Sequence, residues 1–237
     1  MNIVLLEQQD WIDEQHVELR DARLAHLHSV LRSQPGDHLK VGLLGGDRGN
    51  GEIVSLSKER ACLRVTLDQA PLPRHPCTLV LALPRPKMLR RVLRTCAEFG
   101  VREIHLIHSY RVEKSFWQSP LLAPERIRTA LHAGLERSGD TIAPRVQLHR
   151  RFRPFIEDSL EHVDAGAPAY CLHPGGTAAL GADSGESSTL LIGPEGGFVP
   201  FELELMQANN VALRHLGSRI LSVDTAVNTA LARDLPR

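Results

Sequence analysis

The sequence predicts an α/β protein in which a small β-barrel, residues 1–72, precedes a larger domain, residues 73–237, with a parallel sheet and helices on both faces. The first seventy residues alternate short apolar runs with turns, which is typical of short antiparallel strands. Three prolines within the eight residues 69–76 indicate a linker. From residue 78 onward, short apolar runs alternate with longer helical stretches, as in an α/β sheet. A chain of 237 residues that is 42% hydrophobic can bury a core of this size.

The predicted barrel rests on alternation and on glycine. Leu39, Val41 and Leu43 occupy every second position, as expected for a strand with one buried face. Glycines at 45–46 and 49–51 then punctuate the chain between apolar runs. The segment before these strands contains one helical pattern, so we expect a barrel with a single helix.

The second domain is predicted to contain six strands and five helices. Gly100 is placed to end the first of these helices through a positive φ, and Asp224 or Thr225 can cap the start of the last one. The small and polar segment 175–188 predicts an irregular loop. The expected strands are 78–83, 101–109, 145–149, 168–173, 189–193 and 211–217, and the expected helices are 88–99, 124–137, 153–163, 200–209 and 224–234.

The charges are distributed unevenly, although the formal net charge is zero. Residues 71–154 carry 16 Lys and Arg against 6 Asp and Glu, whereas both flanking parts are acidic. A basic middle segment fits either an RNA-binding surface or a solvated helix face.

Other classes of protein are disfavoured by the composition. No apolar run approaches the roughly 18 residues that a membrane helix needs, and the first residues lack the pattern of a secretory signal. The four cysteines form no CxxC pair, and no histidine has a convincing metal-ligand spacing. We therefore expect a cytoplasmic protein with reduced core cysteines, no metal site and no membrane partner.

The stretch LLIGPEGGF, residues 190–198, runs from a buried strand into a turn with almost no side chains. Such a turn lets a ligand approach backbone N–H and C=O groups directly. It matches neither the dinucleotide nor the triphosphate glycine pattern, and Glu195 would repel a phosphate. The turn therefore favours a cationic or neutral ligand, with an ordinary strand-to-helix turn as the alternative.

A second segment, HLGSRILSVDTAVNTALA, residues 215–232, places apolar side chains in a loop before the last helix. Apolar loop residues are costly unless something covers them. Leu216, Ile220 and Leu221 could line a pocket for a flat aromatic ring whose edge meets loop backbone groups.

These two segments together resemble the paired signatures of the RsmE family, ribosomal RNA uridine-N3 methyltransferases of the SPOUT superfamily. The resemblance continues in LALPRPKM, AEFGVREIHLIHS and ERIRTALHAGLERSG, which follow in family order. It implies a PUA-like RNA-binding barrel, a SPOUT-type trefoil-knotted α/β domain, a homodimer, and S-adenosyl-L-methionine as the cofactor. The implied reaction transfers a methyl group to N3 of a uridine in 16S, small-subunit, ribosomal RNA.

The implied reaction also indicates which residues could act in the site. Stabilising the imide anion of the acceptor base calls for a cation, and Arg85, Arg111 and Lys114 in the basic middle segment are the candidates. Glu136 is a candidate base, with an exposed helix carboxylate as the favoured alternative. The implied cofactor contacts are Leu172, His173, Ile192, Gly193, Glu195, Gly196, Gly197, Leu216, Gly217, Ile220, Leu221, Val223, Thr225 and Ala226.

Several positions depart from the family pattern. Ser222 stands where the family usually has Arg, and Asp224 stands in place of Glu; Arg137 and Thr95 replace Gln and Lys. These changes leave the cofactor segments largely intact but bear on how the acceptor RNA is held. Two alternatives therefore stay open: a divergent methyltransferase acting on another RNA position, and an inactive RNA-binding protein of the same fold. A third alternative, an α/β enzyme that uses NAD, is disfavoured by the missing fingerprint.

Overall fold

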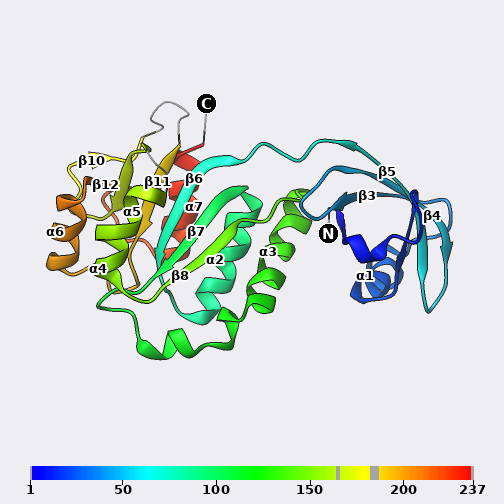
Figure 1. Ribbon diagram of the computed structural model, residues 1–237, viewed down its shortest axis with the longest axis horizontal. Helices are drawn as coiled ribbons and strands as arrows, with labels where there is room; N and C mark the ends of the chain where they lie inside the picture. Colours follow the sequence, from blue (N-terminus) through cyan, green and yellow to red (C-terminus); the bar gives the residue numbers. More distant parts are fainter. Residues whose placement is uncertain (1, 164–165, 182–186, 236–237) are drawn as a thin grey trace. The chain divides into compact units, whose positions relative to one another are not determined.

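A computed structural model describes residues 2–163, 166–181 and 187–235. Contacts within the chain divide it into two compact units, which are drawn in Figure 1. The first unit comprises Met1–Pro73 and His132–Ala143, and the second comprises Arg74–Leu131 and Pro144–Arg237. Residues 132–143, which the sequence analysis placed in the second domain, thus group with the first unit.

The first unit contains a five-stranded sheet in the order β1-β3-β4-β5-β2. β1 pairs with β3 in parallel, and the other pairs are antiparallel. Its elements are β1 (Val4–Leu6), η1 (Gln8–Asp10), β2 (His16–Leu19), α1 (Ala22–His26), η2 (Leu27–Leu31), β3 (His38–Leu43), β4 (Arg48–Leu56) and β5 (Ala61–Gln69).

The core of this unit lies between the sheet and the helical segment after β2. Fully buried side chains from β1, β2, β4 and β5, including Leu6, Val17, Ile53 and Leu63, meet Leu27. β4 and β5 approach so closely at Gly49 that a Cβ there would lie 1.9 Å from the carbonyl oxygen of Thr66. The glycine cluster therefore serves strand pairing in addition to turn formation.

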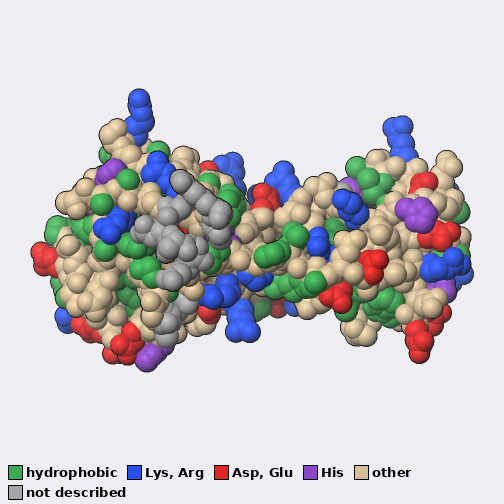
Figure 2. All heavy atoms as spheres, turned by 90° about the horizontal axis from the view of Figure 1, so that it is seen from above, with side chains coloured by type: hydrophobic (Ala, Val, Ile, Leu, Met, Phe, Trp, Pro, Cys, Tyr) green, Lys and Arg blue, Asp and Glu red, His purple; other side chains and the backbone are tan. Residues whose placement is uncertain are grey.

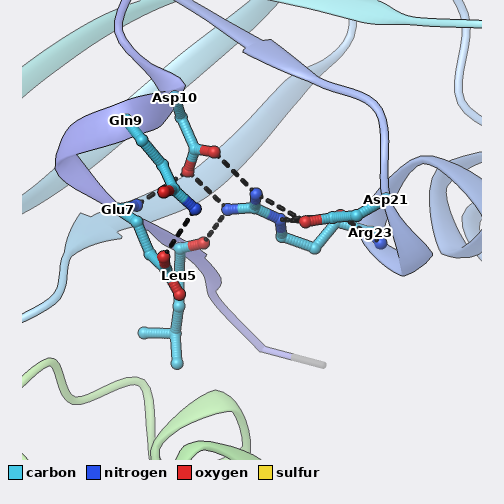
Figure 3. A network of polar contacts seen from close by, with 6 residues as sticks. All are labelled: Leu5, Glu7, Gln9, Asp10, Asp21 and Arg23. Carbon is cyan, nitrogen blue, oxygen red and sulfur yellow. Dashed lines mark hydrogen bonds and ion pairs between the residues drawn. The ribbon is translucent and has the colours of Figure 1, made fainter.

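A largely buried ion-pair network joins three segments of the same unit (Figure 3). The guanidinium of Arg23 donates to both carboxylate oxygens of Asp10 at 2.6 and 2.8 Å, and Nη1 also donates to the carbonyl oxygen of Leu5 at 2.7 Å. Asp21 caps α1 by accepting from the backbone N–H of Arg23 at 2.9 Å. Burial opposes the charge of Arg23, but the hydrogen bonds to Asp10 and Asp21 outweigh burial and raise its pKa. The network ties β1, η1 and the start of α1 together.

The second unit contains a seven-stranded sheet in the order β10-β12-β9-β11-β6-β7-β8, and every neighbouring pair in it is parallel. The central strands β6 and β11 are buried almost throughout, as expected for a sheet covered on both faces. The strands are β6 (His75–Ala82), β7 (Val101–Ile107), β8 (Arg145–His149), β9 (Ala169–Leu172), β10 (Ala178–Ala179), β11 (Ser188–Ile192) and β12 (Val211–His215).

Helices flank this sheet on both faces: α2 and α7 lie against one face, and α4 and α5 lie against the other (Figure 1). α2 ends where predicted, because Gly100 adopts φ +70° directly after its last turn. The helical elements are α2 (Pro86–Glu98), η3 (Lys114–Gln118), η4 (Pro120–Leu122), α3 (Pro124–Ser138), α4 (Phe152–Pro154), η5 (Phe155–Ser159), α5 (Leu160–Val163), α6 (Pro200–Ala208) and α7 (Val223–Arg233).

The predicted α/β class, with a parallel sheet and helices on both faces, is therefore confirmed. Each of the six predicted strands of the second domain overlaps an observed strand. The short strand β10 was not predicted: it lies in the segment 175–188, of which residues 182–186 are outside the described part of the chain. None of the helices in the described part is long and apolar enough to span a bilayer.

The cysteines are free thiols, and Cys77, Cys96 and Cys171 are buried. Burial raises the pKa of Cys171 to about 12, so this thiol stays protonated and unreactive. His75, Cys77 and Asp234 bring potential metal-ligating atoms within 4.8 Å of one another. Both ring nitrogens of His75, however, already contact backbone: Nδ1 accepts from the N–H of Cys77 at 3.1 Å, and Nε2 donates to the carbonyl oxygen of Leu231 at 3.0 Å. Through these contacts, His75 links β6 to α7.

Candidate functional site

The two side-chain-poor segments follow neighbouring strands of the parallel sheet. β9 pairs with β11 on one side and with β12 on the other. Because parallel strands end at the same edge, the turn after β11 (residues 193–199) and the loop after β12 (residues 216–222) meet beyond that edge. Ligands of open α/β sheets commonly bind at this edge.

A cavity of about 590 Å³ lies between these segments. Thirteen of the fourteen residues that the resemblance implied as cofactor contacts line it, and Thr225 does not. The described residues that line it are Arg111, Leu172, His173, Pro174, Ile192, Gly193, Pro194, Glu195, Gly196, Gly197, Phe198, Leu216, Gly217, Arg219, Ile220, Leu221, Ser222, Val223 and Ala226.

Two glycines in this wall have positive φ, and a third packs closely against an arginine side chain. Gly197 and Gly217 have φ of +72° and +131°, which few other residues adopt. At Gly196 the obstacle is close approach, since a Cβ there would lie 2.9 Å from Cδ of Arg111. The bare turn therefore lets the Arg111 side chain lie against its backbone.

Two arginines contact the glycine-rich turn. Arg111, in the segment after β7, donates a hydrogen bond from its guanidinium to the carbonyl oxygen of Gly196. The backbone N–H of Arg85 donates to Oε1 of Glu195 at 3.3 Å, and its mostly exposed guanidinium lies 4.0 Å from the same oxygen. Arg111 therefore lines the cavity itself, whereas Arg85 reaches it through Glu195.

The start of α7 is organised by the two residues that depart from the family pattern. The prediction that Asp224 or Thr225 caps this helix is wrong, because Ser222 is the N-cap residue. Its hydroxyl donates to Oδ1 of Asp224 at 2.6 Å and lies 2.9 Å from the Thr225 hydroxyl. Asp224 also lies 3.7 Å from the guanidinium of Arg91 on α2. The Thr225 hydroxyl thus contacts the cap residue, and Thr225 is not among the residues that line the cavity.

Glu136 lies elsewhere. It belongs to the carboxyl-terminal part of α3 that groups with the first unit, where its backbone carbonyl accepts from the N–H of Asn2 at 2.7 Å. Burial raises the pKa of its carboxyl group. Neither Glu136 nor Lys114 is among the residues that line the cavity.

Some lining residues were missed by the sequence analysis as site residues, namely Pro174, Pro194, Phe198 and Arg219. Phe198 is buried directly behind Gly193, and its ring lies 3.2 Å from where a Cβ of that glycine would be. An aromatic residue immediately after the glycine pair was the available signal, because a bare turn needs a side chain to support it from the core.

The cavity combines apolar walls, bare backbone and few charges. Leu172, Ile192 and Leu221 offer apolar surface, whereas Glu195 supplies a carboxylate and Arg111 a guanidinium. Such a site suits a ligand with a flat apolar part, polar edges and both charge signs. On the face seen in Figure 2, Lys and Arg side chains are interspersed with Asp and Glu, so that face presents no uninterrupted basic field.

Comparisons with known proteins show the family of this chain. A family model described as an RNA methyltransferase domain matches residues 70–233. The ribosomal RNA small subunit methyltransferase E of Treponema pallidum is 32% identical, over 98% of this chain and 90% of that protein. The protein of the same name from Synechocystis is 31% identical, over 94% of this chain and 73% of that protein.

Solved structures show the same fold. A ribosomal RNA small subunit methyltransferase E from Neisseria gonorrhoeae, bound to S-adenosyl methionine, aligns with a TM-score of 0.77 at 21% identity and covers 98% of this chain and 95% of that one. A methyltransferase from Legionella pneumophila in complex with the same cofactor aligns with a TM-score of 0.75 at 20% identity, over 98% and 95% of the two chains. The chain therefore belongs to the RNA methyltransferase family that includes the ribosomal RNA small subunit methyltransferase E proteins.

Proposed function

We propose that this protein is an S-adenosyl-L-methionine-dependent methyltransferase that modifies N3 of a uridine in small-subunit (16S) ribosomal RNA. The observation that carries the proposal is the meeting of the 193–199 turn and the 216–222 loop around one cavity in a chain of this family. The curated relatives carry names that state the ribosomal RNA substrate.

The cavity fits this cofactor on chemical grounds. Apolar side chains such as Leu221 can cover a purine ring, and bare backbone at Gly193 and Gly217 can hydrogen-bond its edge. Glu195 would face the cationic part of the ligand. When bound, S-adenosylmethionine supplies a methyl group attached to a positively charged sulfur.

The protein's own residues would act on the acceptor. Holding the two reactants at attack distance accounts for much of the rate of such a transfer. The N3 proton of uridine must also pass to solvent water, and a nearby cation stabilises the imide anion that results. A guanidinium has five N–H donors, so Arg111 can hold the Gly196 carbonyl and still donate to that anion. Arg85 is a second candidate because it contacts Glu195. Glu136 is not assigned as the base, because its carboxyl group does not line the cavity.

Further parts of the proposal concern the fold and assembly. We propose that the first unit is a PUA-like barrel that binds RNA and that the chain between β11 and α7 is threaded as a trefoil knot. We propose that residues 1–72 form the first domain and residues 73–237 the second, and that the protein acts in the cytoplasm. We also propose a homodimer, in which the partner would cover Ile220, an apolar side chain that is 89% exposed in the single chain.

A divergent methyltransferase acting on another RNA position is the second candidate. One observation favours it: Ser222 lines the cavity where the family usually has an arginine, and its hydroxyl is engaged by Asp224. A cation that could contact RNA is thus replaced by a neutral cap.

Methyl transfer to RNA tests the proposal directly. Purified protein and labelled S-adenosylmethionine are incubated with small subunits from a strain that lacks the protein, and the product is mapped by mass spectrometry. Label on uridine N3 supports the first candidate, and label on another atom supports the divergent enzyme. A folded protein that binds the cofactor but labels no RNA, free or assembled, would refute both and favour an inactive binding protein.

A further inference from the structure

The side chain of Glu202 is buried beneath the glycine-rich turn and accepts hydrogen bonds from two backbone N–H groups of different segments. It lies in the first turn of α6 and is only 2% exposed. Oε1 accepts from the N–H of Tyr110 at 2.8 Å, and Oε2 accepts from the N–H of Val199 at 3.0 Å. Burying a carboxylate is unfavourable unless hydrogen bonds satisfy it, and here both oxygens have such a bond.

These two N–H groups belong to residues that neighbour the cavity lining in the sequence, because Val199 follows Phe198 and Tyr110 precedes Arg111. Val199 ends the turn that contains Gly193, Glu195 and Gly196, whereas Tyr110 immediately precedes Arg111. The guanidinium of Arg111 in turn donates to the carbonyl oxygen of Gly196. The two segments are therefore linked twice, once beneath the turn by Glu202 and once at the cavity wall by Arg111.

Capping of α6 does not by itself explain this arrangement. A helix cap needs an acceptor for N–H groups of its own first turn and its N-cap, which the contact with Val199 provides. The contact with Tyr110 crosses 92 positions of sequence and satisfies no group of the helix. A carboxylate suits both contacts because each oxygen can only accept, whereas a glutamine would turn its NH₂ group toward one of the two donors.

We propose that Glu202 is a positioning residue for methyl transfer, which fixes the backbone of Tyr110 so that Arg111 is held against the glycine-rich turn. The inference rests on the proposed function, in which Arg111 meets the acceptor base. Glu202 itself touches neither cofactor nor RNA. Its effect on the reaction passes through the position of one guanidinium.

The test compares Glu202→Gln with Glu204→Gln, which changes an exposed carboxylate on the same helix. Activity, the Kd of S-adenosylmethionine and the melting temperature are measured for each variant, for Arg111→Ala and for the double variant Glu202→Gln/Arg111→Ala. We expect Glu202→Gln to lower kcat by about 10- to 100-fold, as expected for a misplaced charged hydrogen-bond donor, with KM for RNA changed by less than about threefold. Glu204→Gln should match the wild type.

Non-additivity separates positioning from general stability. If Glu202 acts through Arg111, the double variant should be no slower than Arg111→Ala alone. A loss of kcat in the double variant that equals the product of the two single losses would overturn the inference. A kcat of Glu202→Gln within about twofold of the wild-type value would overturn it as well.

A structural readout distinguishes failure of this inference from failure of the proposed function. In a crystal structure of Glu202→Gln, the Arg111 guanidinium should have left the Gly196 carbonyl, and backbone hydrogen exchange at Tyr110 should be faster than in Glu204→Gln. An unmoved Arg111 and an equally protected Tyr110 amide contradict the positioning role even if the wild type transfers methyl groups. If the wild type transfers none, the proposed function fails, and this readout still decides whether Glu202 fixes Arg111.

Discussion

Acid should destabilise the second unit through a pair of histidines that pack against Phe155, the first residue of η5. His105 on β7 is 3% exposed, and its Nδ1 lies 3.0 Å from Nε2 of His149 on β8. Phe155 covers both rings, with centroid distances of 5.7 and 4.5 Å. Burial lowers the pKa of His105 to about 4, although Glu103, 3.6 Å away, opposes the shift. Burial also lowers the pKa of His149.

The sign of the effect follows from proton uptake on unfolding. In the unfolded chain His105 binds a proton below its ordinary pKa of 6.5, whereas in the folded protein its imidazole stays neutral until the pH approaches 4. The stabilisation is therefore fully present above about pH 6.5 and is lost as the pH falls toward the folded value. With a slope of about 1.4 kcal/mol per pH unit, His105 alone should cost about 2 kcal/mol of unfolding free energy between about pH 7.5 and pH 5.

Chemical denaturation measures this loss. A Trp11→Phe background leaves Trp117, in the second unit, as the fluorescent reporter. In that background, urea unfolding is compared at the two pH values for the parent, for His105→Gln and for His162→Gln, which changes an exposed histidine. The loss of unfolding free energy between the higher and the lower pH should be about 2 kcal/mol smaller in His105→Gln than in the parent. In His162→Gln this loss should equal that of the parent. An identical pH dependence in the parent and in His105→Gln would refute the reasoning.

Three further outcomes are expected. Gly196→Arg should abolish calorimetrically detectable binding of S-adenosylmethionine, because a Cβ there would lie 2.9 Å from Cδ of Arg111 and the rest of the new side chain must enter the cavity. A Kd within about threefold of the wild-type value would argue against the site. Asp10→Asn should lower the unfolding free energy by about 3 kcal/mol, since it leaves the largely buried Arg23 without its full counter-charge. Glu52→Gln, which changes the exposed ion pair with Arg64, should lower the unfolding free energy by less than about 1 kcal/mol. Equal losses of the two variants in urea unfolding would contradict this expectation. Ile220→Asp should convert a dimer to a monomer in light scattering if the exposed side chain lies in the interface, and an unchanged mass would exclude it from that interface.

The sequence predicted the cavity lining well where a residue directly follows a buried strand. Ile192 and Gly193 end one apolar run and Leu216 and Gly217 end another, so parallel pairing alone brings them to one edge. Arg111 was named for its charge in the basic middle segment, and the structure brings it to the cavity wall.

Other features depended on contacts that no local pattern contains. Glu202 looks like an ordinary first-turn carboxylate, and its second partner lies in a segment far away in the sequence. Ser222, Asp224 and Thr225 are all good cap residues, so only the backbone conformation decides which of them starts α7. Glu136 follows a motif-like segment, but the end of its helix groups with the first unit.

A crystal structure with S-adenosylmethionine tests the central claim most directly. The account predicts the cofactor between the 193–199 turn and the 216–222 loop, with backbone groups of both segments hydrogen-bonded to it and Arg111 beside its methyl group. A cofactor bound at another place, or a cavity that stays closed by the protein's own side chains at saturating cofactor, would contradict it.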